Sequence, residues 1–377
     1  MTGLEAHRQN DTVRLFLGGD VMTGRGIDQI LPHPGDPTLH EGYVETAEGY
    51  VALAEQRNGP IPRAVPFGYI WGDLLDDLER RDCDLRFVNL ETAVTTSDTA
   101  APKGINYRMH PANAPVLSAA GIDAVTLANN HTLDWGIAGL VETLDVVEKL
   151  GISVVGAGRT GPDAAAPQML PLPNGGRVLI LAYGARDSGI PGHWGAAPAW
   201  PGINLLPDRP DAAVADARAR LENRRQAGDV TLVSIHWGGN WGYEMDPEHR
   251  RLAHRLIEEA GVDIVHGHSS HHPKAIEIHE GKLVLYGAGD LINDYEGISG
   301  RETFRSDLVL GYVAEIAASD GRIQSLELLP YRIRRFRLCR AKPEESEWLH
   351  AMLQRECGAF GLHVAQNAAG AFQLTPS

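Results

Sequence analysis

The chain has 377 residues, and its 34 Lys and Arg against 49 Asp and Glu give a formal net charge of −15 at pH 7. This length predicts one large or two ordinary domains, and 43% hydrophobic with 22% charged residues is typical of a globular protein. The acidic charge argues against nucleic acid or an anionic membrane as partner, because both would repel the chain. No apolar run reaches the length of a membrane span, the first residues lack the layout of a secretory signal, and three cysteines without a CxxC motif suggest a reducing compartment. We therefore expect a cytoplasmic enzyme, and the sequence leaves its oligomeric state open.

Short apolar runs bounded by turn residues alternate with longer helical patterns along the chain. This alternation predicts an α/β fold in which sheets and helices form layers. In chain order, strands are predicted at Val13–Leu17, Leu85–Leu90, Ala124–Leu127, Ser153–Val155, Val178–Ala182, Val230–Ile235 and Asp263–Val265, with hairpins at Ala275–Tyr286 and Gly311–Leu329. Helices are predicted at Gly136–Leu150, Ala212–Arg225, Pro247–Ala260 and Glu344–Arg355, and the last is followed by a polar end.

Most of the predicted strands are followed directly by a carboxylate, an amide or an imidazole. The residues in question, in chain order, are Asp20, Glu91, Asn130, His131, Asp134, His236, His268, His271 and Asp290. In open sheets, ligands gather in the crevice beyond the carboxyl ends of the strands, so these side chains should converge. Mixed oxygen and nitrogen donors without cysteine suit Mn, Fe, Zn or Ca. The pattern therefore predicts a site for a divalent metal ion whose identity stays open.

Each of these residues also has an ordinary structural interpretation. A lone Asp20 after a strand is often a turn or capping residue, and Asn130 could be a turn amide. Asp134 could cap the helix that follows it or orient a neighbouring group. His266 is expected to be a packed histidine, and His272 is undecided. The joint pattern carries the prediction, since it is far less expected by chance than any one member.

At the same motifs the chain resembles the CapA family, named for capsular poly-γ-glutamate synthesis proteins, within the calcineurin-like metallophosphoesterase superfamily. The motifs GDVMTGR, NLE, NNHTLDWG, HWGGNWGYE and GHSSHH, followed by GKLVLYGAGD, stand in the family's order between Val13 and Asp294. The resemblance implies a β-sandwich flanked by helices. We expect a catalytic domain at residues 1–340 and a C-terminal helix and tail at 341–377 packed on it. The implied metal ligands are Asp20, Glu91, Asn130, His236, His268 and His271, with His131 as the catalytic imidazole.

The chain departs from the superfamily at one position. Typical members begin with a DxH motif, whereas Met22 takes the place of that histidine here. A thioether is a poor ligand for a hard cation, and this loss speaks against a full two-metal phosphatase site. We also expect no N-terminal anchor of the kind that membrane-attached members carry, which fits poorly with an outward-facing capsule role.

Three functions from different classes are compatible with these motifs. The favoured one is suggested by CapA-like proteins that invert the C-terminal residue of lasso-peptide precursors. His131 and His271 or His268 would serve the two faces of the Cα, oriented by Asp134 or Asp290, and a cation would stabilise the enolate charge. The second is hydrolysis of a phosphoester or a γ-glutamyl amide. The third is a non-catalytic subunit of a polymer synthase.

Two long segments, Leu31–Pro66 and Gly184–Pro207, are expected to form the walls of a substrate cleft. A free peptide carboxylate is best held by an arginine, and Arg25 and Arg186 are the candidates, although either could form an ordinary ion pair. Tryptophans in or near these motifs could contact a bulky substrate residue or simply pack the core. They are Trp194, Trp200, Trp237 and Trp241.

Overall fold

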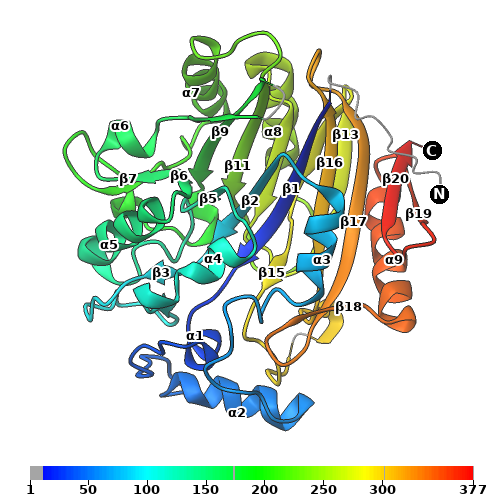
Figure 1. Ribbon diagram of the computed structural model, residues 1–377. Coiled ribbons are helices and arrows are strands. Elements are labelled where there is room, and N and C mark those ends of the chain that lie inside the picture. The colour runs from blue at the N-terminus through cyan, green and yellow to red at the C-terminus, as the bar shows by residue number, and fades with distance from the viewer. Residues whose placement is uncertain (1–11, 173–174, 301, 377) are drawn as a thin grey trace.

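The computed structural model describes residues 12–172, 175–300 and 302–376, in which two large β-sheets stack with helices outside them (Figure 1). The first sheet contains β1 (Thr12–Val21), β2 (Leu85–Leu90), β5 (Ala124–Thr126), β6 (Ser153–Val155), β15 (Asp290–Ile292), β16 (Leu308–Ala317), β17 (Ile323–Ile333), β18 (Leu338–Arg340), β19 (Leu362–Gln366) and β20 (Phe372–Pro376). Their order is β19-β20-β17-β16-β1-β2-β5-β6, with β15 beside β1 and β18 beside β17. The neighbouring strands β1, β2, β5 and β6 run parallel to one another.

The second sheet has the order β13-β14-β12-β11-β9-β8. Its strands are β8 (Gln168–Pro171), β9 (Arg177–Gly184), β11 (Val230–His236), β12 (Ile264–His268), β13 (Ile276–His279) and β14 (Lys282–Leu285). The inner strands β9, β11, β12 and β14 are parallel, so their carboxyl ends meet at one edge. Two small pairs complete the strands described: β3 (Ala93–Val94) with β4 (Arg108–Met109), and β7 (Ala157–Gly158) with β10 (Gly202–Ile203).

Helices cover the outer surfaces and one edge of the molecule. They are α1 (Gly26–Ile30), α2 (Ala47–Asn58), α3 (Asp73–Arg81), α4 (Pro115–Ala119), α5 (Gly136–Lys149), α6 (Gly161–Ala164), α7 (Pro210–Glu222), α8 (Pro247–Ala260) and α9 (Pro343–Gly358). Helix α8 has clear ends, because Asp246 accepts from Glu248 N at its start and Gly261 adopts a left-handed φ of 69° at its end. In Figure 1, α9 lies beside β19 and β20.

Alternating side chains give the second sheet two apolar faces. Val233 and Ile235 pack with Leu252 and other residues of α7 and α8 in one hydrophobic cluster. Leu232 and Ile264, one position out of phase, belong to the larger cluster that also contains the first sheet. Because side chains alternate along a strand, the next residues on this inner face are Ser234 and His236 in β11, and His266 and His268 in β12. The inter-sheet face therefore turns from apolar to polar at the carboxyl ends of these strands.

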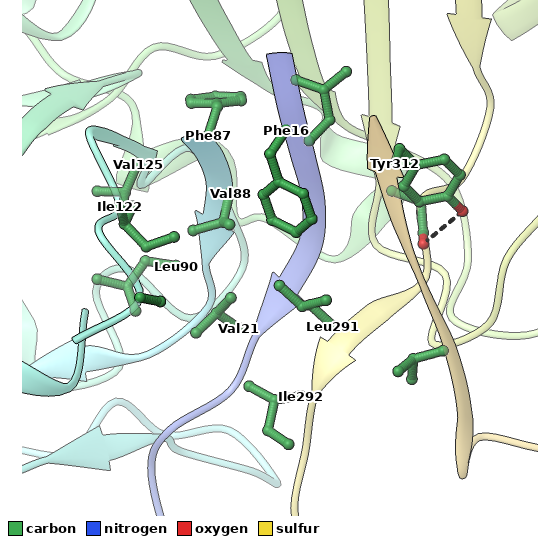
Figure 2. Packing of buried hydrophobic residues seen from close by; sticks show 14 of the residues in the cluster. Phe16, Val21, Phe87, Val88, Leu90, Ile122, Val125, Leu291, Ile292 and Tyr312 are labelled. Carbon is green, nitrogen blue, oxygen red and sulfur yellow. Dashed lines mark hydrogen bonds between the residues drawn. The ribbon is translucent and has the colours of Figure 1, made fainter. Parts of the chain in front are cut away.

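The packing around β1 determines where the carboxyl end of this strand lies. Figure 2 shows Phe16 and Val21 of β1 packed among Phe87, Val88 and Leu291, all of them buried. β1 is buried over nearly its whole length, as expected for a central strand that is covered on both faces. Gly19 has to be glycine, because a Cβ there would overlap the carbonyl oxygen of Gly289. This close contact of β1 with the loop before β15 places Asp20 opposite Asp290.

The layered α/β class and the expected sandwich are confirmed, and the structure adds elements that the sequence interpretation left out. The segment Leu31–Pro66 contains α2, so it is not an open loop throughout. The polar end after the last predicted helix forms β19 and β20, which extend the first sheet beyond β17. Among the described residues, no helix is both long and apolar enough to span a membrane.

Candidate metal centre

Asp20 lies at the centre of the polar cluster between the two sheets. It is fully buried at the end of β1, beside Asn89 of β2 and Asp290 of β15. Asn89 Nδ2 donates to Asp20 Oδ1 at 2.7 Å, and the N–H of Ser269 donates to Oδ2 at 3.3 Å. Ser269 can do so because its left-handed φ of 104° turns the chain sharply after β12. Burial, with a contribution from Asp290, raises the pKa of Asp20 to about 7.

Two groups of potential ligands share this carboxylate. In the first, Asp20, His236 and His268 each offer one atom, and these atoms lie within 4.8 Å of one another. The Nδ1 atoms of the two histidines are 2.8 Å apart, and His268 Nδ1 is 3.6 Å from Asp20 Oδ1. One ligand comes from the first sheet and two from the second, so this group spans the sandwich.

The second group consists of Asp20, His271 and Asp290, also within 4.8 Å. His271 Nδ1 lies 2.9 Å from Asp290 Oδ1, and Asp290 Oδ2 accepts from Asn293 Nδ2 at 2.7 Å. Asp290 was predicted as an orienting carboxylate, and the geometry gives it a ligand position as well. Met22, which replaces the histidine of the DxH motif, is buried in the core. A second metal position is still possible without that histidine, because His271 and Asp290 supply donors beside Asp20.

The polar atoms at this site fit a bound cation. Asn130 Oδ1 and His236 Nε2 are buried with no hydrogen-bond partner among the described residues. An unsatisfied buried polar group costs roughly 1–3 kcal/mol, and a cation bound to the ligand group that contains His236 would satisfy the atom of that residue. Carboxylate, amide and imidazole donors suit Mn, Fe, Zn or Ca and do not select among them. Of the predicted ligands, Glu91 is buried beside Asp20 but belongs to neither three-residue group.

His131 forms an imidazole–carboxylate pair at the edge of this cluster. Its Nδ1 lies 2.6 Å from Asp134 Oδ2, and its Nε2 lies 3.7 Å from Glu91 Oε1. Asp134 also accepts from the N–H of Tyr107 and from Lys103 Nζ, each at 2.7 Å. Burial lowers the pKa of His131 to about 4, against the opposing effect of Asp134. Asp134 therefore orients the imidazole ring of His131. It does not cap α5, because the N-cap residue of that helix is Trp135 and no side chain caps the helix there.

Several residues of the site were not identified from the sequence. Lys103 Nζ donates to the carbonyl oxygen of Asn130 and lies 3.3 Å from His131 Nδ1. The ring of Tyr107 packs edge-on against His131 at 4.3 Å between centroids, and its hydroxyl is 3.0 Å from that of Tyr295. The Tyr295 hydroxyl is 3.4 Å from His271 Nε2. Lys103 and Tyr107 do not follow a predicted strand, and Tyr295 follows β15, which the sequence pattern did not predict, so the strand-end rule did not identify them.

Asn89 and Asn129 form a second layer under the ligands. Asn129 Nδ2 donates to Asn89 Oδ1 and to the carbonyl oxygen of Leu90, both at 2.9 Å. Asn129 Oδ1 in turn accepts from the N–H of His131 at 3.0 Å. Both asparagines stand in the NLE and NNH motifs, so the signal was present in the sequence.

The two candidate arginines lie in different environments. Arg25 is buried and bonded to Asp294 and Glu41, and its guanidinium lies 3.9 Å from the centroid of the Tyr50 ring. This corrects the expectation that Arg25 could hold a substrate carboxylate, since its charge is already neutralised inside the protein. Arg186 is exposed and its Nε is 3.4 Å from Asp208.

The four tryptophans also differ in position. Trp241 packs near His271, with ring centroids 5.4 Å apart, and Trp194 is buried with Lys103 Nζ 5.4 Å from its ring. Trp200 is 60% exposed, whereas Trp237 is buried and donates from Nε1 to the Tyr286 carbonyl oxygen. Trp237 is therefore a packing residue, whereas Trp241 contacts His271 of the second ligand group and Trp194 contacts Lys103.

Comparison with known proteins agrees with these motifs. The family described as "Bacterial capsule synthesis protein PGA_cap" matches residues 14–295. The chain is 44% identical over 369 residues to a "Probable polyglutamine synthesis accessory protein" of Mycobacterium tuberculosis, covering 97% of each chain. It is 26% identical over 287 residues to the "PGA biosynthesis protein CapA" of Bacillus subtilis, covering 76% of this chain and 64% of that protein.

Among solved structures, a phosphatase of Mycoplasma pneumoniae aligns over 89% of this chain and 96% of its own, with 13% identity and a TM-score of 0.45. The family match extends from β1 to Tyr295 and so includes every ligand of both groups at Asp20. The chain therefore belongs to the bacterial capsule synthesis protein PGA_cap family.

Proposed function

We propose that this chain is a metal-dependent enzyme that inverts the Cα configuration of a peptide's C-terminal residue. The observation that carries the proposal is the presence of two imidazole–carboxylate pairs, His131 with Asp134 and His271 with Asp290. The pairs come from different parts of the fold, one after β5 and the other between β12 and β15. Inversion needs one group to remove the Cα proton and another to return a proton on the opposite face.

His131 is suited to the role of base. Its buried ring is neutral over most of the pH range, because its pKa is lowered to about 4. The contact with Asp134 leaves Nε2 as the nitrogen that can accept a proton. His271 would return the proton, and Asp290 and Tyr295 hold its ring in place. A divalent cation held at Asp20 would stabilise the negative charge that develops on the substrate carbonyl or carboxylate.

A cavity that reaches the second pair only through intervening residues offers room for part of a substrate. Its volume is about 550 Å³, and Asn293 and Tyr295 line it. These two residues contact Asp290 and His271 respectively, so one residue separates the cavity from each member of the second pair. Two cations could receive a free carboxylate: Lys103, which is half-buried beside His131 and paired with Asp134, and the exposed Arg186.

Hydrolysis is the second candidate, and a specific observation favours it. Asp20 belongs to both potential ligand groups, so it could bridge two cations, which is the arrangement that activates water in many hydrolases. His131 would then protonate the leaving group. The names of the relatives suggest a glutamyl polymer as the substrate in that case.

Incubation of the metal-loaded chain with candidate peptides in heavy water, read by mass spectrometry, tests the proposal. Epimerisation predicts the gain of one deuterium at a single Cα without cleavage, and loss of this exchange in His131→Ala. Cleavage products without deuterium at Cα would support hydrolysis instead. The peptides to compare are a free acid and its amide, and a γ-glutamyl oligomer serves as the hydrolase substrate.

A further inference from the structure

A row of buried polar side chains runs behind the ligand His268. Ser234 and His236 in β11 are paired in register with His266 and His268 in β12, so the four side chains form a block on the inner face of the second sheet. All four are buried. His266 was expected to be a packed histidine, and it lies too far along the strand to join either ligand group at Asp20.

The hydrogen bonds in this block have a fixed direction. His266 Nε2 lies 3.0 Å from the carbonyl oxygen of Gly18, which can only accept, so Nε2 carries the proton. No carboxylate contacts this ring among the described residues, so the ring holds one proton and its Nδ1 is an acceptor. The hydroxyl of Ser234 lies 3.1 Å from that Nδ1 and must donate to it. The oxygen of Ser234 is then free to accept from His268 Nε2 at 2.9 Å.

We infer that the chain from Gly18 through His266 and Ser234 fixes His268 in the tautomer that carries its proton on Nε2. Nδ1 of His268 is then an unprotonated nitrogen that faces Asp20. Without a metal, His236 Nδ1, 2.8 Å from it, must be the donor between the two rings, which leaves His236 Nε2 unprotonated as well, and a cation at His268 Nδ1 would take the place of this hydrogen bond. That nitrogen is the buried atom without a partner. Ser234 and His266 are thus positioning residues for metal binding.

The inference rests on the metal centre of the proposed function and is independent of the reaction. Partners that orient a ligating histidine change metal affinity by about 10–100-fold when removed. Ser234→Ala and His266→Phe should therefore weaken zinc binding by about this factor. Ser234→Thr keeps the hydroxyl, and His266→Gln keeps both a donor and an acceptor, so both should bind zinc nearly as well as the natural chain. Ser188→Ala is the matched control, because this buried hydroxyl bonds only to the Ala185 carbonyl oxygen.

Zinc affinity of the full chain is measured by competition with a chelator, and thermal unfolding of the metal-free variants checks the fold. Nitrogen NMR of histidine-labelled, metal-free protein reads the tautomer directly, with the His268 signal identified by its loss in His268→Asn. The inference predicts the Nε2–H form in the natural chain and in Ser234→Thr, and a mixture in Ser234→Ala.

Unchanged zinc affinity and an unchanged tautomer in folded Ser234→Ala and His266→Phe would overturn the inference while leaving the metal centre standing. A natural chain that binds none of zinc, manganese, iron and calcium would instead overturn the metal centre, and the NMR result would still decide the tautomer. Loss of deuterium exchange with normal zinc binding would count against the proposed reaction alone.

Discussion

His131 is the residue on which the proposed chemistry depends most. Its buried ring is oriented by Asp134, which lies 2.6 Å from Nδ1, and its Nε2 lies 3.7 Å from Glu91 at the edge of the cluster. We expect His131→Ala to lower turnover by about 10²–10⁴-fold, the usual contribution of a general base, with little change in thermal stability. His249→Ala is the control, since that imidazole stacks on Trp237 away from the ligand groups. A variant that loses stability but keeps its rate would show that His131 is a packing residue.

Lys103 provides a prediction on pH dependence. Burial is the main cause of the lowered pKa of His131, and the positive charge of Lys103 lowers it further. Replacing the lysine by methionine removes that repulsion, so the pKa of His131 should rise. Since the base must be unprotonated, activity of Lys103→Met should be lost at a higher pH than in the natural chain as the solution is acidified. Profiles of kcat/KM against pH measure the shift.

The matched variant Lys103→Arg keeps the charge, so its acidic limb should stay near that of the natural chain. An acidic limb that stays unchanged in Lys103→Met would contradict the assignment of this limb to His131.

The residues that could be predicted are those that follow a strand. Asp20, His236, His268 and Asp290 were found because parallel strands deliver their carboxyl ends to one edge. Lys103 and Tyr295 could not be found, because their positions depend on how loops fold back over that edge. Arg25 was misjudged, since a GR motif beside a ligand does not reveal that Asp294 and Glu41 will neutralise the charge in the interior.

Among the elements, α2 and the final two strands were missed for different reasons. Helix α2 buries Ala47, Tyr50, Val51 and Ala54, which are spaced as on one face of a helix. In the sequence, the Pro- and Gly-rich residues around this segment concealed that pattern. Strands β19 and β20 are five residues long, and each shows only two buried alternating residues, such as Phe372 and Leu374. Their place beside β17 is a long-range contact that no local pattern specifies.

The structure makes β20 part of the core sheet, and this can be tested by a single substitution. Phe372 is fully buried, and its neighbour Gln373 is exposed. Phe372→Ala should lower the free energy of unfolding by about 3–5 kcal/mol, because it removes a buried aromatic ring and leaves a cavity. Gln373→Ala on the same strand should change it by less than about 0.5 kcal/mol. Urea unfolding measures both, and equal small effects would show that this end of the chain is a loosely attached tail.

At the scale of the whole molecule, the centre joins the two sheets. Asp20 belongs to the first sheet, whereas His236 and His268 belong to the second. A metal that binds only the folded chain stabilises it by mass action, by about 2.7 kcal/mol at a free concentration of 100 times Kd. We therefore expect manganese or zinc to raise the unfolding midpoint of the natural chain. His236→Ala should lose most of this increase, and an equal increase in that variant would place the stabilising metal elsewhere.

The central claim is that the buried cluster around Asp20 is a metal centre, and anomalous X-ray diffraction from crystals loaded with manganese or zinc tests it most directly. The account predicts an anomalous peak within bonding distance of Asp20 and of a nitrogen of His236 or His268, with a second peak permitted beside His271 and Asp290. His254, Glu258 and His279 form a partly exposed group on α8 and β13 that could also bind metal. A peak at that outer group alone, or no peak beside Asp20, would contradict the account.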